Sequence, residues 1–391
     1  MSIIDINKYK EKLTLKKKIT IGVILLIIIV ALTLFLFYLY NEPFRTWTDM
    51  YIFKKNIENT DVVSIEFDIS KNPEIFAYDK YITILERNIL STYNSNGSKL
   101  NDLEIHINKP MYKANGKYLC IAENEGNKIY MISGDNILWQ NSVDGTIDTI
   151  NVNKNGYVSV VEKGTAYKNI IITYSPEGKQ LFKTYLSTSM AIATDISENN
   201  EYLAIAEVDT SGAIIQSNIK VISIEKAKSD PTNSVKYSIP ANKGDLITSI
   251  KYKGKEKLIC IYDNSIHEIN DGVDSVVLEY EEKTKLADIS NRDCVVYAKE
   301  KASGIINNST EIIIKNVQNG NSTTHEVEST IKFLLAHENN IAINMGTEAE
   351  FINTFGWLQK KYKSNQEISD IVLGDSVAGI IYRDRVEIIN L

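Results

Sequence analysis

Residues 151–186 read NVNKNGYVSVVEKGTAYKNIIITYSPEGKQLFKTYL, and the pattern in this stretch recurs along most of the chain. Short runs of Val, Ile, Leu and Tyr alternate with polar residues, and turn residues such as Asn-Gly and Pro-Glu-Gly separate the runs. This pattern is typical of short antiparallel strands that are joined by tight turns. The stretch therefore predicts a small antiparallel sheet.

The same arrangement returns at intervals of about 40 residues, which is the period of a β-propeller blade made of four strands. Comparable runs follow Asn-Gly or Asn-Asn at three further places, namely KYLCIAE (117–123), EYLAIAE (201–207) and IAINM (341–345). No long amphipathic helix is apparent after residue 60, which excludes a doubly wound α/β architecture. We therefore predict an all-β β-propeller over residues 61–391, with eight blades favoured and seven as the alternative.

The two ends of this region complement each other. The stretch 366–391 provides three strands, and a strand at 61–67 is left over at the other end. Pairing them would complete the final blade and remove two exposed sheet edges. We expect the remaining blades at 72–101, 102–142, 143–186, 187–242, 243–281, 282–328 and 329–365.

A long apolar segment, ITIGVILLIIIVALTLFLFYLY, occupies residues 19–40 and carries no charge. The core of a bilayer is about 30 Å thick and needs roughly 20 apolar residues in a helix, so the segment predicts a transmembrane helix that contacts the bilayer. Lysines precede it at positions 8, 10, 12, 16, 17 and 18. They favour a cytoplasmic tail at 1–18 and a single-pass plasma-membrane protein with an extracytoplasmic C-terminal domain. A cleaved signal peptide is the alternative, although its apolar region usually has only about 7–15 residues.

Residues 41–60 connect the apolar segment to the first expected strand. Phe44, Trp47, Tyr51 and Phe53 give this connector an aromatic character. Two interpretations are open. The side chains line one side of a short helix near the membrane surface, or they pack partly within a juxtamembrane stalk, which we favour.

The charge balance excludes one class of partner. The chain has 43 Lys and Arg residues against 50 Asp and Glu residues, a formal net charge of −7. Binding to nucleic-acid phosphates needs clustered positive charge, so we expect no nucleic-acid partner. The hydrophobic fraction of 43% and the charged fraction of 24% fit a folded chain.

Three segments also carry a resemblance to a known family, namely NVNKNGYVSVV (151–161), YSPEGKQLFKTYLS (174–187) and DISENNEYLAIAEVDTSGAIIQS (195–217). The chain resembles an uncharacterised family of bacterial single-pass membrane proteins in which an N-terminal anchor precedes a WD40-like or TolB-like propeller. This resemblance implies the propeller fold and a cell-envelope location, and it implies no activity or catalytic residue. The Gly-His and Trp-Asp landmarks of true WD40 repeats are absent from the sequence.

No sequence motif nominates a catalytic or metal site. His106, His267, His325 and His337 lack zinc-ligand spacing, and the chain has neither a nucleophile elbow nor a P-loop. Residues 151–162 have the spacing of a calcium loop, but Asn replaces the expected carboxylates and strands replace the flanking helices, so we interpret them as a turn. We predict no cofactor, no metal and no catalytic residue, and we do not favour an enzyme.

The three cysteines, Cys120, Cys260 and Cys294, each lie in a strand-like apolar run. We interpret them as buried thiols, because free cysteine packs as a small hydrophobic residue. A bridge between Cys260 and Cys294 is the alternative, and it requires strands that bring the two Cα atoms close together.

Three expected blades have a lengthened turn between their second and third strands, at 162–169, 208–218 and 299–310. These turns contain an exposed aromatic or paired isoleucines, and binding residues concentrate on loops that a rigid scaffold carries. We predict a partner-binding face that consists of Tyr167, Ile214, Ile215, Ile305 and Ile306. The alternative is that each loop folds over and packs on its own blade.

Together these features predict a membrane-anchored extracytoplasmic propeller that acts as a protein-interaction scaffold or sensor in the cell envelope, with an envelope protein as its partner. The alternative is a small-ligand or polysaccharide-binding protein, or an enzyme, that uses the central channel. A mechanical spacer without a specific ligand is a third interpretation.

Overall fold

The computed structural model describes residues 3–55, 57, 62–280, 284–301 and 309–391. The chain divides into two compact units, Met1–Glu58 and Asn59–Leu391. The first unit is helical, and the second consists almost entirely of strands.

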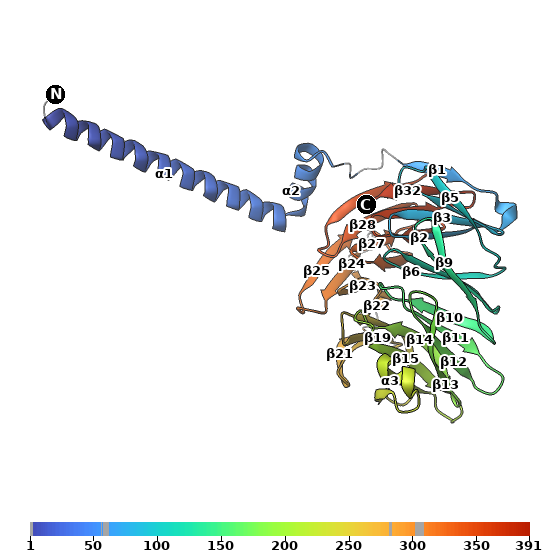
Figure 1. Ribbon diagram of the computed structural model, residues 1–391. Helices are drawn as coiled ribbons and strands as arrows, with labels where there is room; N and C mark the ends of the chain where they lie inside the picture. Colours follow the sequence, from blue (N-terminus) through green and yellow to red (C-terminus); the bar gives the residue numbers. More distant parts are fainter. Residues whose placement is uncertain (1–2, 56, 58–61, 281–283, 302–308) are drawn as a thin grey trace. The chain divides into compact units, whose positions relative to one another are not determined.

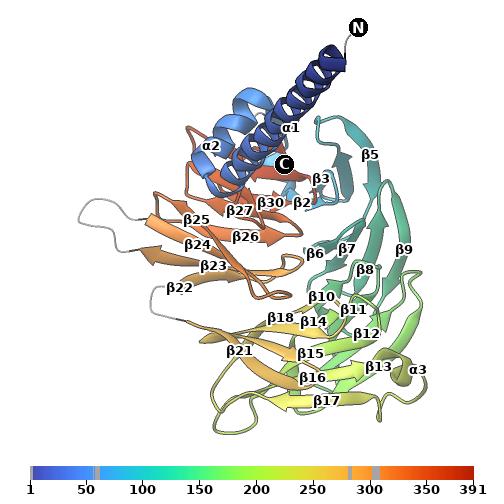
Figure 2. The ribbon, with the colours of Figure 1, turned by 90° about the vertical axis from the view of Figure 1, so that its left-hand side faces the viewer.

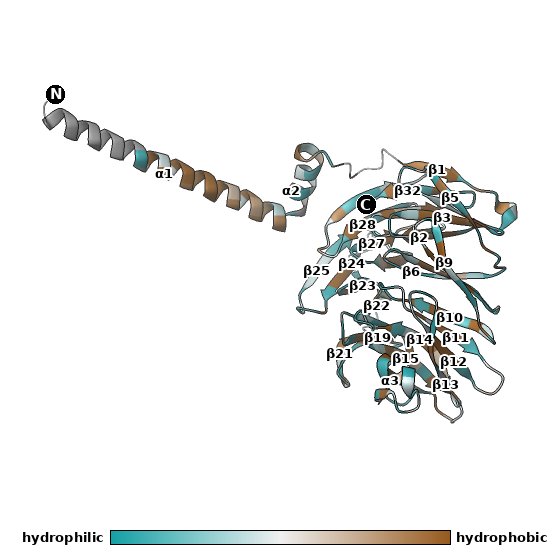
Figure 3. Ribbon diagram, viewed as in Figure 1, coloured by the Kyte–Doolittle hydropathy of each residue, from teal (hydrophilic) through white to brown (hydrophobic). Residues whose placement is uncertain are grey.

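The first unit contains the long helix α1 (Ile3–Tyr40), the short helix α2 (Glu42–Trp47) and the π-helix η1 (Thr48–Ile52). Asn41 ends α1 and caps α2, because its side-chain oxygen accepts a hydrogen bond from Phe44 N at 2.9 Å. Within α1, the 22 residues Ile19–Tyr40 are apolar and unburied, and they form the brown part of the helix in Figure 3. This segment is long and apolar enough to cross a membrane, a property that a signal sequence shares.

The second unit consists of eight four-stranded antiparallel sheets formed by the described residues. Each of the first seven sheets contains four consecutive strands. The first four are β2 (Glu74–Tyr78), β3 (Tyr81–Glu86), β4 (Ile89–Tyr93), β5 (Lys99–Glu104); β6 (Pro110–Asn115), β7 (Tyr118–Glu123), β8 (Lys128–Ser133), β9 (Asn136–Ser142); β10 (Thr146–Val152), β11 (Val158–Lys163), β12 (Asn169–Tyr174), β13 (Gln180–Leu186); and β14 (Ser189–Ile196), β15 (Tyr202–Asp209), β16 (Gln216–Ser223), β17 (Val235–Pro240). The helix α3 (Ile224–Ser229) lies between β16 and β17, and the 3-10 helix η2 (Ile69–Lys71) precedes β2.

The next three sheets follow the same order. They are β18 (Ile247–Lys253), β19 (Lys257–Tyr262), β20 (Ser265–Asn270), β21 (Val273–Glu279); β22 (Thr284–Asp288), β23 (Cys294–Lys301), β24 (Ser309–Asn316), β25 (Ser322–Val327); and β26 (Phe333–His337), β27 (Asn340–Asn344), β28 (Glu348–Asn353), β29 (Leu358–Lys363). Figure 2 shows these sheets as blades around a centre, with β5, β9, β17, β21 and β25 on the rim. The prediction of an eight-bladed propeller after an apolar N-terminal helix is therefore confirmed.

The eighth blade contains both ends of the propeller. Its strand order is β1 (Val63–Glu66), β32 (Arg385–Asn390), β31 (Val377–Ile381) and β30 (Asp370–Leu373), so the first strand is the outermost one. Figure 1 shows β1 beside β32, and Ile65 is paired with Val386 in their antiparallel ladder. Ile82 of the first blade shares a buried cluster with Val377 and Val386 of the eighth. The last blade thus packs on the first and closes the ring.

The turn at 153–156 explains why an Asn-rich run begins a blade strand. Asn153 Oδ1 accepts hydrogen bonds from the backbone of Asn155 and Tyr157 at 3.0 Å. Gly156 has a φ of 84°, and a Cβ there would lie 2.9 Å from the ring of Tyr118. Asn155 Nδ2 also donates to Glu198 O of the next blade at 2.7 Å. The residues with calcium-loop spacing therefore form a turn that also holds two blades together.

Buried clusters fill the interfaces between neighbouring blades. Cys120 and Met131 of the second blade pack with Val158 and Ile172 of the third. All three cysteines are free and buried, so no bridge joins Cys260 to Cys294. Burial raises the pKa of the Cys120 thiol to about 12. The thiols act as small apolar side chains of these clusters, as the sequence predicts.

Candidate functional site

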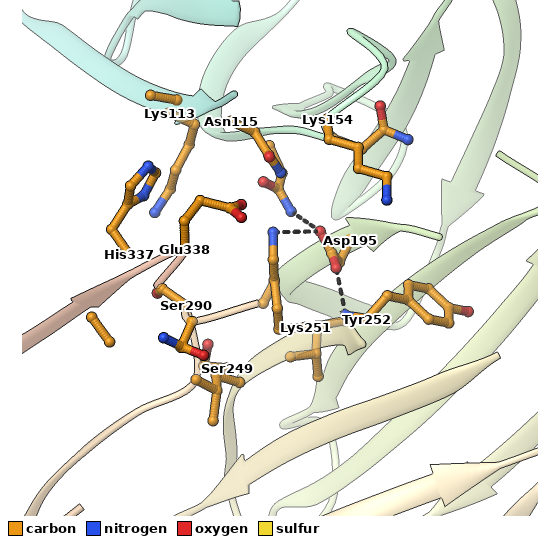
Figure 4. A pocket seen from close by; sticks show the side chains of 18 of the residues that line it. Lys113, Asn115, Lys154, Asp195, Ser249, Lys251, Tyr252, Ser290, His337 and Glu338 are labelled. Atoms are coloured by element: carbon orange, nitrogen blue, oxygen red, sulfur yellow. Dashed lines mark hydrogen bonds and ion pairs between the residues drawn. The ribbon is translucent and has the colours of Figure 1, made fainter. Parts of the chain in front are cut away.

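A cavity of about 760 Å³ lies at the centre of the ring. Its wall consists of the innermost strand of most blades and the turn that follows each strand. Figure 4 shows that polar side chains from several blades project into this space. Propellers commonly carry a channel at this place, and ligand sites of proteins are typically concave.

Asp195, on β14, connects three blades at the wall of the channel. Its Oδ1 accepts a hydrogen bond from Asn151 Nδ2 at 2.7 Å, and its Oδ2 accepts one from the Tyr252 backbone N–H at 2.6 Å. The Lys251 ammonium lies 3.5 Å from Oδ1. Asp195 is only 1% exposed. Because both oxygens of this buried carboxylate are already engaged, its role is structural.

Lys113, on β6 two blades before Asp195, projects into the channel in Figure 4. Within the part of the chain that the structure describes, it has no hydrogen-bond or ion-pair partner. The Lys113 side chain is exposed within the channel. Partial desolvation by the surrounding channel wall lowers its pKa, and the positive charge of Lys251 lowers it further. Lys113 and Lys251 therefore place two neighbouring positive charges at this cavity.

Negative and titratable groups also line this wall. His337 Nε2 lies 3.0 Å from Asp375 Oδ1, and Glu338, which follows His337, has a φ of 47°. Lys154 and Glu198, which also line the cavity, form an ion pair. The lining thus contains both charges, so it is suited to a small charged molecule rather than to an apolar one.

Lys253 is buried at the end of β18. Its ammonium donates hydrogen bonds to Ile289 O at 2.6 Å and to Asn291 O, and these bonds join the fifth blade to the sixth. Burial lowers the pKa of Lys253 to about 7. The side chain holds the inner ends of two blades together.

No group of three or more His, Cys, Asp or Glu residues that could hold a metal occurs among the described residues. The charged side chains of the channel were not predicted from the sequence. Lys251, near the end of a strand, is the one charged residue of this run that faces the cavity, since Lys253 is buried. The other charged residues come together only because separate blades place their innermost strands around the same cavity.

The loop tips proposed from the sequence lie on two neighbouring blades. Tyr167, between β11 and β12, is 39% exposed, and its ring centre lies 4.7 Å from that of Tyr185. Ile214 and Ile215, between β15 and β16, are 56% and 46% exposed. The other two residues, Ile305 and Ile306, lie outside the described residues.

Local hydrogen bonds hold the Ile214 loop in an open shape. Asp209 Oδ1 accepts hydrogen bonds from Ser211 N at 2.8 Å and from Ser211 Oγ at 2.6 Å, which fixes the start of the loop. These bonds lower the pKa of Asp209, and the charge of Lys168 lowers it further. The backbone oxygen of Ile215 accepts a hydrogen bond from Gly244 N at 3.3 Å. The isoleucine side chains are thus left exposed.

Comparison with protein families adds one decisive observation, because a single family description matches residues 54–391. The chain belongs to DUF5711, a family of unknown function. The match covers the whole propeller of this DUF5711 protein. No curated protein matches the chain.

Solved propellers resemble the DUF5711 chain at low sequence identity. The C-terminal WD40 domain of Sif2 matches with a TM-score of 0.56 and 9% identity, over 85% of this chain and 98% of that one. BamB from Moraxella catarrhalis matches with a TM-score of 0.48 and 12% identity, over 85% and 97%. AztD from Citrobacter koseri matches with a TM-score of 0.47 and 10% identity, over 79% and 93%. The similarity to Sif2 shows the fold alone.

Proposed function

We propose that this DUF5711 protein is a membrane-anchored, extracytoplasmic propeller that serves as a protein-interaction scaffold or sensor in the cell envelope. The exposure of Ile214 and Ile215 on a loop that a rigid blade carries is the observation that supports it most. Exposed apolar clusters generally mark docking surfaces, and Tyr167 and Tyr185 form a further exposed pair on the neighbouring blade. Aromatic rings of this kind are enriched in protein interfaces.

Substitution of the loop tip tests the docking face. The variant Ile214→Ser with Ile215→Ser keeps the backbone bonds of the loop and removes its apolar surface. We expect at least about a tenfold loss of the complex that chemical cross-linking captures in intact cells, because central apolar contacts contribute most to such interfaces. The matched control is Val273→Ser with Val276→Ser, which removes exposed valines from β21. Equal complex formation in both variants would exclude this docking face.

The third loop is tested in the same way. We propose that Ile305 and Ile306 belong to the same face, because their sequence repeats the Ser-Gly step that precedes Ile214 and Ile215. The variant Ile305→Ser with Ile306→Ser should weaken the same complex. An unchanged complex would remove these two residues from the face.

The proposed location rests on the charges before the apolar helix, since cytoplasmic flanks carry an excess of lysine. The buried native cysteines allow a thiol-labelling test of the full chain. A membrane-impermeant maleimide should label Asp384→Cys in intact cells and Ser2→Cys only after lysis. The reverse pattern would invert the proposed topology, and loss of the N-terminal tail from the mature protein would show a cleaved signal peptide.

The channel favours a second candidate function, the binding of a small anionic ligand such as an acidic sugar. Lys113 supports it, because this ammonium faces a cavity without an ion-pair partner among the described residues. Binding of a uronic-acid oligosaccharide should weaken about tenfold in Lys113→Met and should be unchanged in Lys128→Met, outside the cavity. No binding to the parent protein would count against the candidate.

A further inference from the structure

The segment after the apolar helix folds back to the end of that helix. The ring centres of Phe37 and Phe44 lie 5.2 Å apart, and those of Tyr38 and Phe53 lie 6.1 Å apart. The Tyr38 hydroxyl donates a hydrogen bond to Asp49 Oδ1 at 2.8 Å. These contacts attach α2 and η1 to the last turns of α1, and Figure 1 shows α2 turning away from the axis of α1.

The polar side chains of this segment are turned inward. Arg45, Thr48 and Asp49 are buried. The Thr48 hydroxyl donates to Phe44 O at 2.7 Å, and the Lys55 ammonium lies 3.1 Å from Asp49 Oδ1. Buried polar groups need such partners, and Thr48 and Asp49 find theirs within this unit.

The apolar side chains of the same segment are turned outward. They are between 49% and 67% exposed, and we call them the interfacial patch: Trp47, Tyr51, Ile52 and Phe53. The ring centres of Trp47 and Tyr51 lie 6.0 Å apart, so these two rings adjoin each other within the patch. In water the exposure of this much apolar surface is unfavourable. In a lipid environment the exposure of the same side chains is favourable.

The position of the interfacial patch indicates its occupant. It begins at Trp47, in the helix α2 that follows Tyr40, and Tyr40 is the last residue of the apolar span and is itself exposed. Trp and Tyr rings concentrate where a membrane span meets the headgroups. Lys54 follows the patch and can reach lipid phosphates, as lysine side chains near span ends do.

We propose that the interfacial patch binds lipid and lies in the headgroup region of the leaflet at the Tyr40 end of the span. This proposal rests on the membrane anchoring given under Proposed function. Residues 42–53 then form a second lipid contact rather than a free stalk, and the linker to the propeller begins at the membrane surface. Amphipathic segments of this kind sit about 5–10 Å into the boundary between headgroups and acyl chains.

Tryptophan fluorescence of the full-length chain in phosphatidylcholine vesicles tests the proposal. The chain contains three tryptophans, and Trp47→Phe removes only the one in the patch. We expect lipids brominated near the glycerol end of the acyl chain to quench the parent protein. This quenching should be lost in Trp47→Phe and kept in the matched control Trp357→Phe, whose substitution lies in the propeller. Lipids brominated near the terminal methyl should quench Trp47 less.

Flotation of the same vesicles distinguishes a failure of the proposed membrane anchor from a failure of the proposed lipid patch. A chain that does not float with the vesicles overturns the proposed anchor, and the lipid patch with it. A chain that floats while Trp47→Phe leaves the lipid quenching unchanged overturns the patch alone. Efficient quenching of Trp47 by aqueous iodide also overturns the patch alone, and this result is expected if a protein partner rather than lipid normally covers these rings.

Discussion

Asp195 supports the channel wall through contacts that reach three blades. Removing its carboxylate in Asp195→Ala leaves the Tyr252 N–H and the Asn151 amide without their acceptor and Lys251 without its counter-charge. We expect the free energy of unfolding in urea to fall by about 3 kcal/mol, as for other buried charged groups that lose a partner.

Asp148→Ala is the matched control, because Asp148 pairs with Lys163 at 2.9 Å but both side chains remain accessible to water. Exposed ion pairs contribute less than about 1 kcal/mol. Similar losses in Asp195→Ala and Asp148→Ala would show that the Asp195 network does not hold the wall together.

Lys253 makes stability depend on pH. Its pKa is about 7 in the folded protein and near 10.5 when unfolded, so the unfolded chain alone binds this proton between those values. Unfolding then takes up a proton, and the free energy of unfolding rises with pH across this window. The variant Lys253→Met lacks this contribution. The free energy of unfolding of the parent protein minus that of the variant should therefore increase from pH 7 to pH 10. A difference that is constant with pH contradicts the assignment.

The residues of the channel illustrate what a sequence leaves open. Asp195 and Tyr252 are 57 positions apart and belong to different blades, and no local pattern connects them. Their contact depends on how neighbouring blades are staggered around the ring. In contrast, the exposure of Ile214 follows from its place between Ser-Gly and a strand, which is local information.

At the level of elements, strands and turns were predictable because each blade repeats a short local pattern. Asn-Gly turns, apolar runs and a period near 40 residues all act over short distances in the chain. The short helices of residues 42–52 were harder to foresee, since the cap at Asn41 and the contact with Tyr38 decide their fold. The aromatic residues themselves were recognised, but which way they face was left open.

The pairing of β1 with β32 yields a direct test of ring closure. Glu66 lies opposite Arg385, next to the pair in which Phe67 N donates to Asp384 O at 3.1 Å. Such a position between ladder hydrogen bonds brings Cα atoms to about 4.5 Å, close enough for a disulfide. We expect Glu66→Cys with Arg385→Cys to form a bridge that joins the two ends of the propeller and raises its melting temperature.

The control pair is Glu66→Cys with Asp384→Cys, whose side chains point to opposite faces of the sheet. Non-reducing electrophoresis after one proteolytic cut within the propeller distinguishes the two pairs. The first pair should keep both fragments together, and the control pair should release them. Release of the fragments from both cysteine pairs would contradict the pairing of β1 with β32.

On the scale of the whole molecule, a ring of eight blades creates two surfaces that no single blade has. One is the central cavity with Lys113 and Lys251, and the other is the row of loop tips on neighbouring blades. The blade number was predictable by counting strands, and so was the shared last blade. The cavity lining was not, because it gathers residues from most of the chain.

The central claim, that the Ile214 loop docks a protein partner, is tested most directly by a photo-activatable amino acid placed at position 214 in living cells. We predict one discrete cross-linked product that contains a cell-envelope protein. The same amino acid at position 273, on the outer strand β21, should not form this product. Irradiation that leaves the protein uncrosslinked at position 214, or that gives the same products at both positions, would contradict the claim.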